Sequence, residues 1–262
     1  KDTLNGKIAD ATGGLPIYNT TDDYGDVKGS GYRTDSSAGT TDGTGLIFAW
    51  PGDTTTGEVH ASINTGSSAK TVTANGDPSV DTDNSRLYGS SVAFDRTGDY
   101  LSVDGGTDFN FGTGDYTIEC WFMTTDNSVN QGIFVLSDTS GGLATDESAH
   151  ITAMIGNDLQ VRPGDGTTTA IWEGKPSNNT WHHIALTRES GTFRAFYDGG
   201  LMYTKTGVTT SHADQYLAIG GYYSTSYLWK GNIQDFRIYK GTAKYTASFT
   251  ALTRNDFTVN DI

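Results

Sequence analysis

The sequence predicts an all-β fold, built as an antiparallel β-sandwich of two sheets. Three observations lead to this prediction: the composition, the spacing of short apolar segments, and the turn residues between them. The 262 residues include 34 Gly, 14 Tyr and 11 Phe, and they include 26 Asp but only 5 Glu. β-Branched and aromatic side chains suit a pleated sheet, while Gly, Asp and Asn suit the connections between strands. A chain of this length can form one large β domain.

The N-terminal residues 1–45 contain few apolar clusters and many turn formers, which predicts an irregular arm or linker. We expect this arm to order against the sandwich or against a neighbouring subunit. The sandwich domain is predicted over residues 46–262. Its first strand is expected in Gly45-Leu-Ile-Phe-Ala-Trp-Pro51, which Gly and Pro bound, and a second in Lys70-Thr-Val-Thr-Ala-Asn-Gly76, which ends in a turn dipeptide.

Beyond residue 86, short apolar segments recur with turn signals between them. No segment of helical length with a 3.6-residue period separates them, so the pattern favours an antiparallel sandwich over βαβ units. Asp104-Gly105, Asp165-Gly166 and Asp198-Gly199 are typical of hairpin turns. A short helical turn is expected only around Thr242. The predicted strands are residues 90–95, 99–103, 115–123, 132–137, 149–155, 158–162, 168–173, 181–188, 192–198, 201–204, 215–219 and 231–239.

The charge balance limits the classes of partner. A formal net charge of −14 argues against nucleic acid, because a protein that neutralises phosphates needs a cationic face. The same repulsion excludes anionic membranes. No apolar run approaches the ~20 residues that cross a bilayer. Lys1 begins without the pattern of a signal peptide, so a processed or excised soluble unit is expected.

Four segments in the C-terminal half carry a resemblance to a known family. They are Trp181-His-His-Ile-Ala-Leu-Thr-Arg188, Phe193-Arg-Ala-Phe-Tyr-Asp-Gly199, Leu217-Ala-Ile-Gly-Gly221 and Gly231-Asn-Ile-Gln-Asp-Phe-Arg-Ile-Tyr239. In order and spacing they resemble the C-terminal half of laminin-G-like, or concanavalin A-like, jelly-roll domains. Together with the upstream segments 94–102 and 114–122, the resemblance covers about residues 86–250. It implies an all-β, antiparallel jelly-roll β-sandwich.

Two further stretches suggest a biological context. Residues 14–35 and the segment from Tyr239 to Thr250 look like the leader and the tail of laminin-G-like modules in large appendage proteins of marine bacteriophages. Related modules also occur in bacterial surface adhesins. The resemblance therefore implies an extracellular or virion-surface location.

An enzyme is not expected. Jelly-roll glucanases carry two Glu residues a few positions apart on one strand, because a retaining mechanism needs two carboxyl groups ~5 Å apart. The five Glu residues of this chain are isolated from one another: Glu58, Glu119, Glu147, Glu173 and Glu189. His182 and His183 are accompanied by no Ser or Cys nucleophile with an orienting acid. Cys120 is the only cysteine, which excludes an intrachain disulfide, and it is expected to be buried and inert.

Asp235 is the candidate metal ligand. The resemblance implies that the Asp of the closing strand binds a structural calcium ion together with backbone carbonyls of the opening strands. Gly89 to Asp95 is the region expected to supply those carbonyls, since calcium takes six to eight oxygen ligands. The alternative is that Asp235 pairs with Arg237 or caps a turn.

Five aromatic residues are the candidate ligand contacts. Sugars stack their CH-rich faces on aromatic rings while nearby amides and carboxylates bind their hydroxyls. Contact with a glycan, contact with another subunit and simple packing all remain open for these rings. Trp121, Trp181, Phe193 and Tyr239 are assigned to the core or scaffold instead. The candidate ligand-binding residues are Trp172, Tyr222, Tyr223, Tyr227 and Trp229.

Two functions follow from these patterns. The first is a non-enzymatic adhesion module that binds a cell-surface glycan from a virion or cell-surface appendage. The second is a structural subunit of a virion or extracellular assembly, which decorates it or builds a filament through contacts with copies of itself or with neighbouring subunits. Fold alone does not choose between them.

Overall fold

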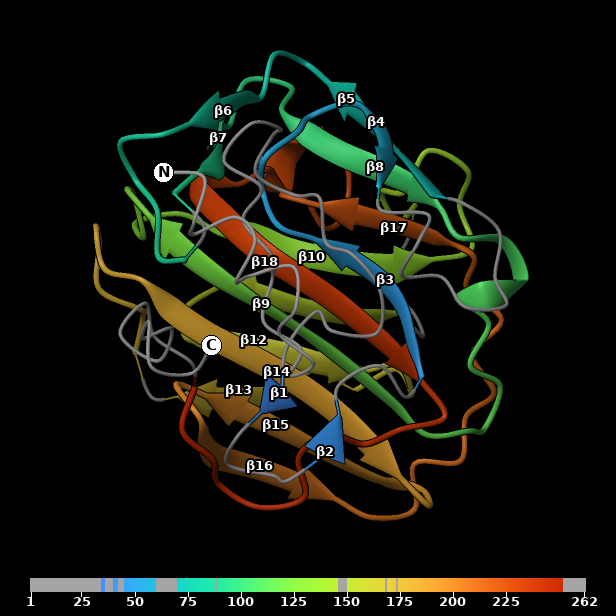
Figure 1. Ribbon diagram of the computed structural model, residues 1–262. Helices are drawn as coiled ribbons and strands as arrows, with labels where there is room; N and C mark the ends of the chain where they lie inside the picture. Colours follow the sequence, from blue (N-terminus) through green and yellow to red (C-terminus); the bar gives the residue numbers. More distant parts are fainter. Residues whose placement is uncertain are drawn as a thin grey trace, which may run out of the picture.

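A computed structural model shows a sandwich of two antiparallel sheets (Figure 1). It describes residues 34–35, 40–41, 45–59, 70–87, 89–145, 150–167, 169–172 and 174–251. In that part of the chain every pairing between named strands is antiparallel. No helix there is both long and apolar enough to span a membrane. The predicted all-β jelly-roll sandwich is confirmed.

The first sheet, called sheet I, has the strand order β13-β12-β11-β10-β17-β8-β5-β4 among the described residues. Strands far apart in the sequence meet at its centre, because β17 pairs with both β8 and β10. Its strands are β4 (Gly57–Val59), β5 (Lys70–Asn75), β8 (Tyr100–Asp104), β10 (Gln131–Ser137), β11 (Ile151–Ile155), β12 (Leu159–Pro163), β13 (Thr169–Trp172) and β17 (Tyr216–Ile219).

The second sheet, called sheet II, has the order β16-β15-β14-β9-β18-β7-β6, and β3 also pairs with β18. Its centre is formed by β9 and β18, which lie side by side in Figure 1. Its strands are β3 (Leu46–Trp50), β6 (Ser79–Asp81), β7 (Ser91–Asp95), β9 (Tyr116–Thr124), β14 (His182–Glu189), β15 (Thr192–Tyr197), β16 (Gly200–Lys205) and β18 (Lys230–Lys240).

The core lies between the two sheets and is rich in aromatic rings. Phe236 on β18 meets Phe48 and Phe134 edge-on, with ring centroids 6.2 and 5.2 Å apart. Since Phe134 belongs to sheet I and the other two rings to sheet II, these contacts join the layers. Edge-to-face pairs contribute roughly 0.5–1.5 kcal/mol beyond the burial of apolar area.

The outer face of sheet II is covered by residues 241–251, which we call the C-terminal strap. Tyr245 stacks on Phe249 at 3.6 Å, and both rings contact Phe196 of β15. The Thr187 hydroxyl donates to the Tyr245 carbonyl at 3.0 Å, and the Phe249 amide donates to the Gly199 carbonyl at 2.8 Å. The strap therefore covers part of the outer face of sheet II, around β14 and β15.

Most predicted strands are confirmed, including the hairpin of β14 and β15, which turns at Ser190-Gly191. The Asp198-Gly199 turn joins β15 to β16, and both of its residues have positive φ. The prediction missed β4 and β6, which are three residues long. Asp104-Gly105 does not form a hairpin, because it leads into the short helix η2 (Gly106–Asp108). The helical turn predicted around Thr242 is also wrong: this segment is irregular, with bends, and hydrogen bonds from Thr117 and Thr187 hold its carbonyls against sheet II.

The predicted N-terminal arm, residues 1–45, lies largely outside the described residues. The exceptions are β1 (Thr34–Asp35) and β2 (Thr40–Thr41), which pair with each other, and Gly45. The predicted sandwich boundary at residue 46 coincides with the first residue of β3, although residues 252–262 also lie outside the described part.

Candidate functional site

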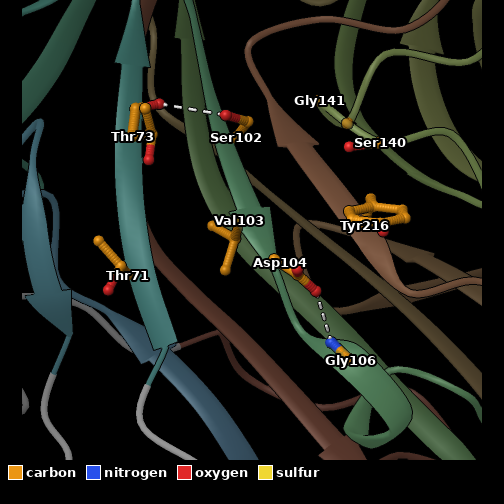
Figure 2. A pocket seen from close by; sticks show the side chains of 10 residues that line it. Thr71, Thr73, Ser102, Val103, Asp104, Gly106, Ser140, Gly141 and Tyr216 are labelled. Atoms are coloured by element: carbon orange, nitrogen blue, oxygen red, sulfur yellow. Dashed lines mark hydrogen bonds between the residues drawn. The ribbon is translucent and has the colours of Figure 1, made fainter.

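The outer face of sheet I carries a cleft of about 540 Å³ (Figure 2). Strands β5, β8 and β17 form its floor, and residues 140–142 form a wall beside β17. The described residues that line it are mostly hydroxylic or glycine: Thr71, Thr73, Ser102, Val103, Asp104, Gly106, Ser140, Gly141, Gly142 and Tyr216.

Strand alternation explains why this floor is polar. On β8, Leu101 and Val103 are buried in the core, while Ser102 and Asp104 point outward. Since successive side chains of a strand point to opposite faces, the polar residues of neighbouring strands fall into rows across the sheet. Ser102 lies opposite Thr73 of β5, and Asp104 lies opposite Tyr216 of β17.

Figure 2 shows the two Thr side chains and the Tyr216 ring on opposite sides of Asp104. The Asp104 carboxylate accepts a hydrogen bond from the Gly106 amide at 2.9 Å through Oδ1. That bond holds the end of β8 in place and involves only one of the two carboxylate oxygens. The cleft thus combines hydroxyl groups, one exposed carboxylate and one half-buried aromatic ring.

The wall of the cleft depends on a glycine. Gly142 has a φ of +94°, and a Cβ at this position would lie 2.8 Å from the Leu217 carbonyl oxygen. Only glycine combines this backbone conformation with such a close approach to β17. The Ser137 hydroxyl donates to the Gly142 carbonyl at 2.8 Å, which fixes the wall against β10.

The predicted ring platform is only partly present. Tyr223 and Tyr227 are half-buried, and their ring centroids lie 6.0 Å apart. Tyr222 lies 6.2 Å from each of them but is only 1% exposed. It covers the outer face of sheet I, where it packs with Val135 and Met154. The expectation that Tyr222 is an exposed stacking ring is therefore wrong.

Trp229 is also not a rim residue, since it is fully buried in the core. Its ring meets Phe122 edge-on at 5.8 Å, and its amide donates to the Gly220 carbonyl. Residues directly before β18 enter the space between the sheets, so the apolar ring faces inward. The backbone of Trp172 lies in β13 at the edge of sheet I, and its ring is outside the described side chains.

Asp235 sits on a bulge of β18 with a φ of 54° and is fully buried. Its Oδ2 lies 3.2 Å from Arg237 Nη2, which is the ion pair that the sequence left as the alternative to calcium. The same guanidinium nitrogen lies 3.1 Å from Glu119 Oε1. One cation thus already faces two carboxylates here. A calcium ion at Asp235 stays a prediction.

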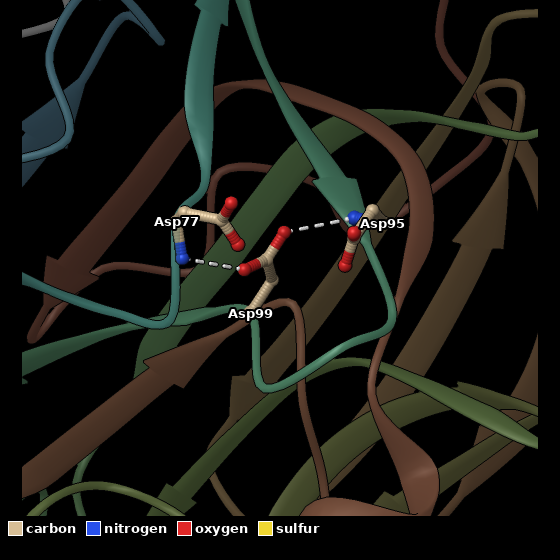
Figure 3. A group of neighbouring side chains, drawn as sticks. All are labelled: Asp77, Asp95 and Asp99. Atoms are coloured by element: carbon tan, nitrogen blue, oxygen red, sulfur yellow. Dashed lines mark hydrogen bonds between the residues drawn. The ribbon is translucent and has the colours of Figure 1, made fainter.

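Three other carboxylates are placed where oxygen ligands could hold a cation: Asp77, Asp95 and Asp99, with one oxygen of each within 4.8 Å of the others (Figure 3). Asp99 is 2% exposed and accepts hydrogen bonds from the Asp77 amide at 2.8 Å and the Asp95 amide at 2.9 Å. Burial raises the pKa of Asp99, and the two neighbouring carboxylates add to the effect. Asp95 belongs to the region predicted to supply calcium ligands, whereas Asp235 is not part of this group.

The two histidines of the Trp-His-His motif lie away from the cleft, on β14 of sheet II. His182 Nδ1 is 2.8 Å from Asp198 Oδ2, and His183 Nε2 is 3.2 Å from the buried Glu119 Oε2. Cys120 is buried, and burial raises the pKa of its thiol well above the ordinary value. The prediction that the thiol is buried is confirmed, and its inertness stays a prediction.

Of the residues assigned to the core or scaffold, Trp121, Phe193 and Tyr239 are buried, and Trp181 packs against Trp121. The cleft residues themselves were missed by the sequence prediction. A signal for them exists, because the outward positions of residues 71–73 and 102–104 are Thr, Ser and Asp rather than apolar. That signal marks a solvent-facing strand equally well, so it does not by itself identify a cleft.

The family model for the concanavalin A-like lectin/glucanases superfamily matches residues 95–246. No curated protein matches the chain at a significant level. Solved structures with the same fold include domain 4 of AbnA, a GH43 extracellular arabinanase from Geobacillus stearothermophilus, in complex with arabinotriose. The two share 16% identity over 75% of this chain and 92% of that domain, with a TM-score of 0.53.

Toxin binding domains are also similar in structure. The binding domain of Paraclostridial Mosquitocidal Protein 1 shares 13% identity over 81% of this chain and 50% of its own, with a TM-score of 0.52. The binding domain of botulinum neurotoxin DC, in complex with SialylT, shares 12% identity over 77% of this chain and 50% of its own, also with a TM-score of 0.52. This chain therefore spans about half the length of these toxin domains.

Proposed function

This chain belongs to the concanavalin A-like lectin/glucanase superfamily, and from that premise we propose that it is a non-enzymatic carbohydrate-binding module with its site in the cleft of sheet I. The observation that carries the proposal is the lining of the cleft. Hydroxyl groups, a carboxylate and the Tyr216 ring lie together on an outward-facing surface. Such groups bind sugars, because rings stack on their CH faces while carboxylates and hydroxyls bind their OH groups.

Two further observations support a binding module. The arabinanase domain and one of the toxin domains are each described in complex with a carbohydrate. The half-buried rings of Tyr100, Tyr223 and Tyr227 pack against the hydrophobic cluster around Tyr222 on the outer face of sheet I. Tyr100 is the first residue of β8, two positions before Ser102. These rings extend the candidate surface along β8 beyond the cleft, so a glycan of several units fits the proposal better than a single sugar.

The proposed setting is extracellular, on a cell surface or on a virion or phage appendage. Adhesion of this kind relies on many weak contacts, because several tethered sites raise the effective concentration of the ligand. The shallow cleft and its few rings agree with weak binding at each site. The proposed partner is therefore a cell-surface glycan that is displayed in many copies.

The test is a glycan array probed with the whole chain displayed in many copies, followed by calorimetry on the best ligand. Replacing Tyr216 with Ala should weaken binding about tenfold, the size of an aromatic stacking contact. Thr73→Val should weaken binding about three- to tenfold through the loss of one hydrogen bond. Thr204→Val is the matched control, since Thr204 is exposed on β16 of sheet II. Unchanged affinity in both cleft variants would contradict the proposed site.

A second candidate function is a structural subunit that decorates or builds an assembly. It is retained because the burial of Tyr222 and Trp229 removes two of the five predicted glycan contacts. Light scattering over a range of protein concentrations distinguishes the two functions. Self-association that survives while no glycan binds would favour the structural subunit.

A further inference from the structure

We propose that the cleft selects neutral glycans with neighbouring hydroxyl groups and discriminates against anionic ones, and that Asp104 is the residue that sets this preference. This inference rests on the proposed carbohydrate-binding function and makes it more specific. The charges around the cleft support it. Among the described side chains that line it, Asp104 is the only charged one, and it is exposed.

Two lysines beside the cleft do not line it. Lys70, which precedes Thr71 on β5, is 1% exposed and points its Nζ to Asp108 Oδ2 at 2.7 Å. Lys240 donates through Nζ to the Thr107 carbonyl at 2.9 Å. Both ammonium groups are thus committed to partners on or beside helix η2. Sialylated or sulfated sugars are bound in proteins by cationic groups, and the described lining presents none.

The geometry of Asp104 suits hydroxyl groups instead. Its Oδ1 accepts the Gly106 amide, so the carboxylate is oriented by its own turn before a ligand arrives. Two oxygens on one carboxylate can accept from two adjacent hydroxyls, and an ionised acceptor forms hydrogen bonds about twice as strong as neutral ones. Tyr216 lies directly across the strand pair, so a ring stacked on it would place its edge near Asp104.

The size of the discrimination follows from Coulomb's law. A second negative charge ~6 Å from Asp104, at the high effective dielectric of a surface, weakens binding roughly three- to tenfold. The overall charge of −14 acts in the same direction. Because the Debye length shrinks from about 8 Å at physiological ionic strength to about 3 Å in 1 M salt, the discrimination should diminish at high salt.

The experiment compares neutral glycans with their own sialylated or sulfated derivatives on one array, using the whole chain displayed in many copies. The neutral member of each pair should bind roughly three- to tenfold better. Asp104→Asn keeps an oxygen that can accept the Gly106 amide and removes the charge. It should weaken the neutral ligands and bring the anionic ones to the same level, so the preference disappears.

Asp83→Asn is the matched control, because it removes one exposed charge from the 81–84 turn beside β6 and should leave the preference intact. Equal or better binding of anionic glycans by the wild type would overturn the inference while the proposed function survives. A preference that persists in Asp104→Asn would also overturn it. If no glycan of either kind binds, the proposed function fails and this inference fails with it.

Discussion

At the residue scale, a buried ionic network on sheet II joins the centre of the sheet to the C-terminal strap. Arg237 contacts Glu119 and Asp235, while Glu119 Oε2 also accepts a hydrogen bond from the Tyr245 hydroxyl at 2.9 Å. Glu119, Asp235 and Arg237 are each at most 1% exposed. The two carboxylates raise the pKa of Arg237, although burial by itself would lower it. Arg237 is therefore expected to remain charged at any ordinary pH.

Replacing Arg237 with Met should destabilise the fold by about 3–5 kcal/mol, because two buried carboxylates would lose their cation. The measurement is urea denaturation at neutral pH. Arg194→Met is the matched control, since Arg194 pairs with the half-exposed Glu189 on the surface of sheet II. That variant should lose less than about 1 kcal/mol. Equal losses in the two variants would mean that the network does not stabilise the fold.

A second prediction concerns His212 and the pH dependence of the free energy of unfolding. Burial lowers the pKa of His212 to about 4, and the nearby Arg188 cation acts in the same direction. Since the unfolded chain binds the proton near pH 6.5, it carries more protons than the folded chain between about pH 6.5 and 4. The free energy of unfolding should therefore fall as the pH drops through this range, by about 2 kcal/mol at pH 5.

Urea denaturation at pH 7.5 and pH 5.0 measures this loss in the wild type and in His212→Gln. The variant should lose less stability between the two pH values. Asp214, whose Oδ2 lies 3.8 Å from His212 Nδ1, acts in the opposite sense, because burial raises its pKa in the folded chain. An identical pH dependence in both proteins would contradict the role of His212.

At the element scale, the strap and the hairpin of β15 and β16 are held together at a glycine. Gly199 has a φ of +80°, and a Cβ there would lie 2.1 Å from the Phe249 carbonyl oxygen. Leu201 adds a second contact, because its amide donates to the Ser248 hydroxyl at 3.0 Å. A side chain at residue 199 would push the strap away from sheet II.

Gly199→Ala should therefore destabilise the protein more than Gly207→Ala. Gly207 has a φ of +74° but meets nothing within 4 Å, so its substitution isolates the backbone strain, about 1–2 kcal/mol. The clash with Phe249 should add about 2 kcal/mol or more at Gly199. Thermal and urea denaturation of both variants measure the difference. Equal destabilisation would show that the strap does not depend on this close approach.

At the scale of the whole molecule, the strap packs on the outer face of sheet II, and the cleft lies on the outer face of sheet I over β5, β8 and β17. The strap and the proposed ligand surface are therefore on opposite outer faces of the sandwich. A structural metal ion would act at this scale as well, because an ion that binds only the folded chain stabilises all of it by mass action.

The calcium prediction is tested by the melting temperature with calcium and with a chelator. If Asp235 holds the ion, Asp235→Ala should remove the difference between the two conditions. Asp99→Asn provides the comparison, since Asp99 lies in the separate group with Asp77 and Asp95. Identical melting of the wild type in calcium and in chelator would exclude a stabilising site at either place.

The sequence by itself determined most of the strands, the antiparallel pairing of β14 with β15 and the sandwich. These depend on a period of two and on turn residues such as Gly191 between β14 and β15 and Asp198-Gly199 between β15 and β16, which are local properties of the chain. The tertiary structure alone decided which aromatic rings face solvent and where the cleft lies. Tyr222 is buried by what packs across it, and Thr71 and Tyr216 line one cleft only because β17 returns beside β8. Contacts between distant segments leave no periodic signal, so only the folded chain could show them.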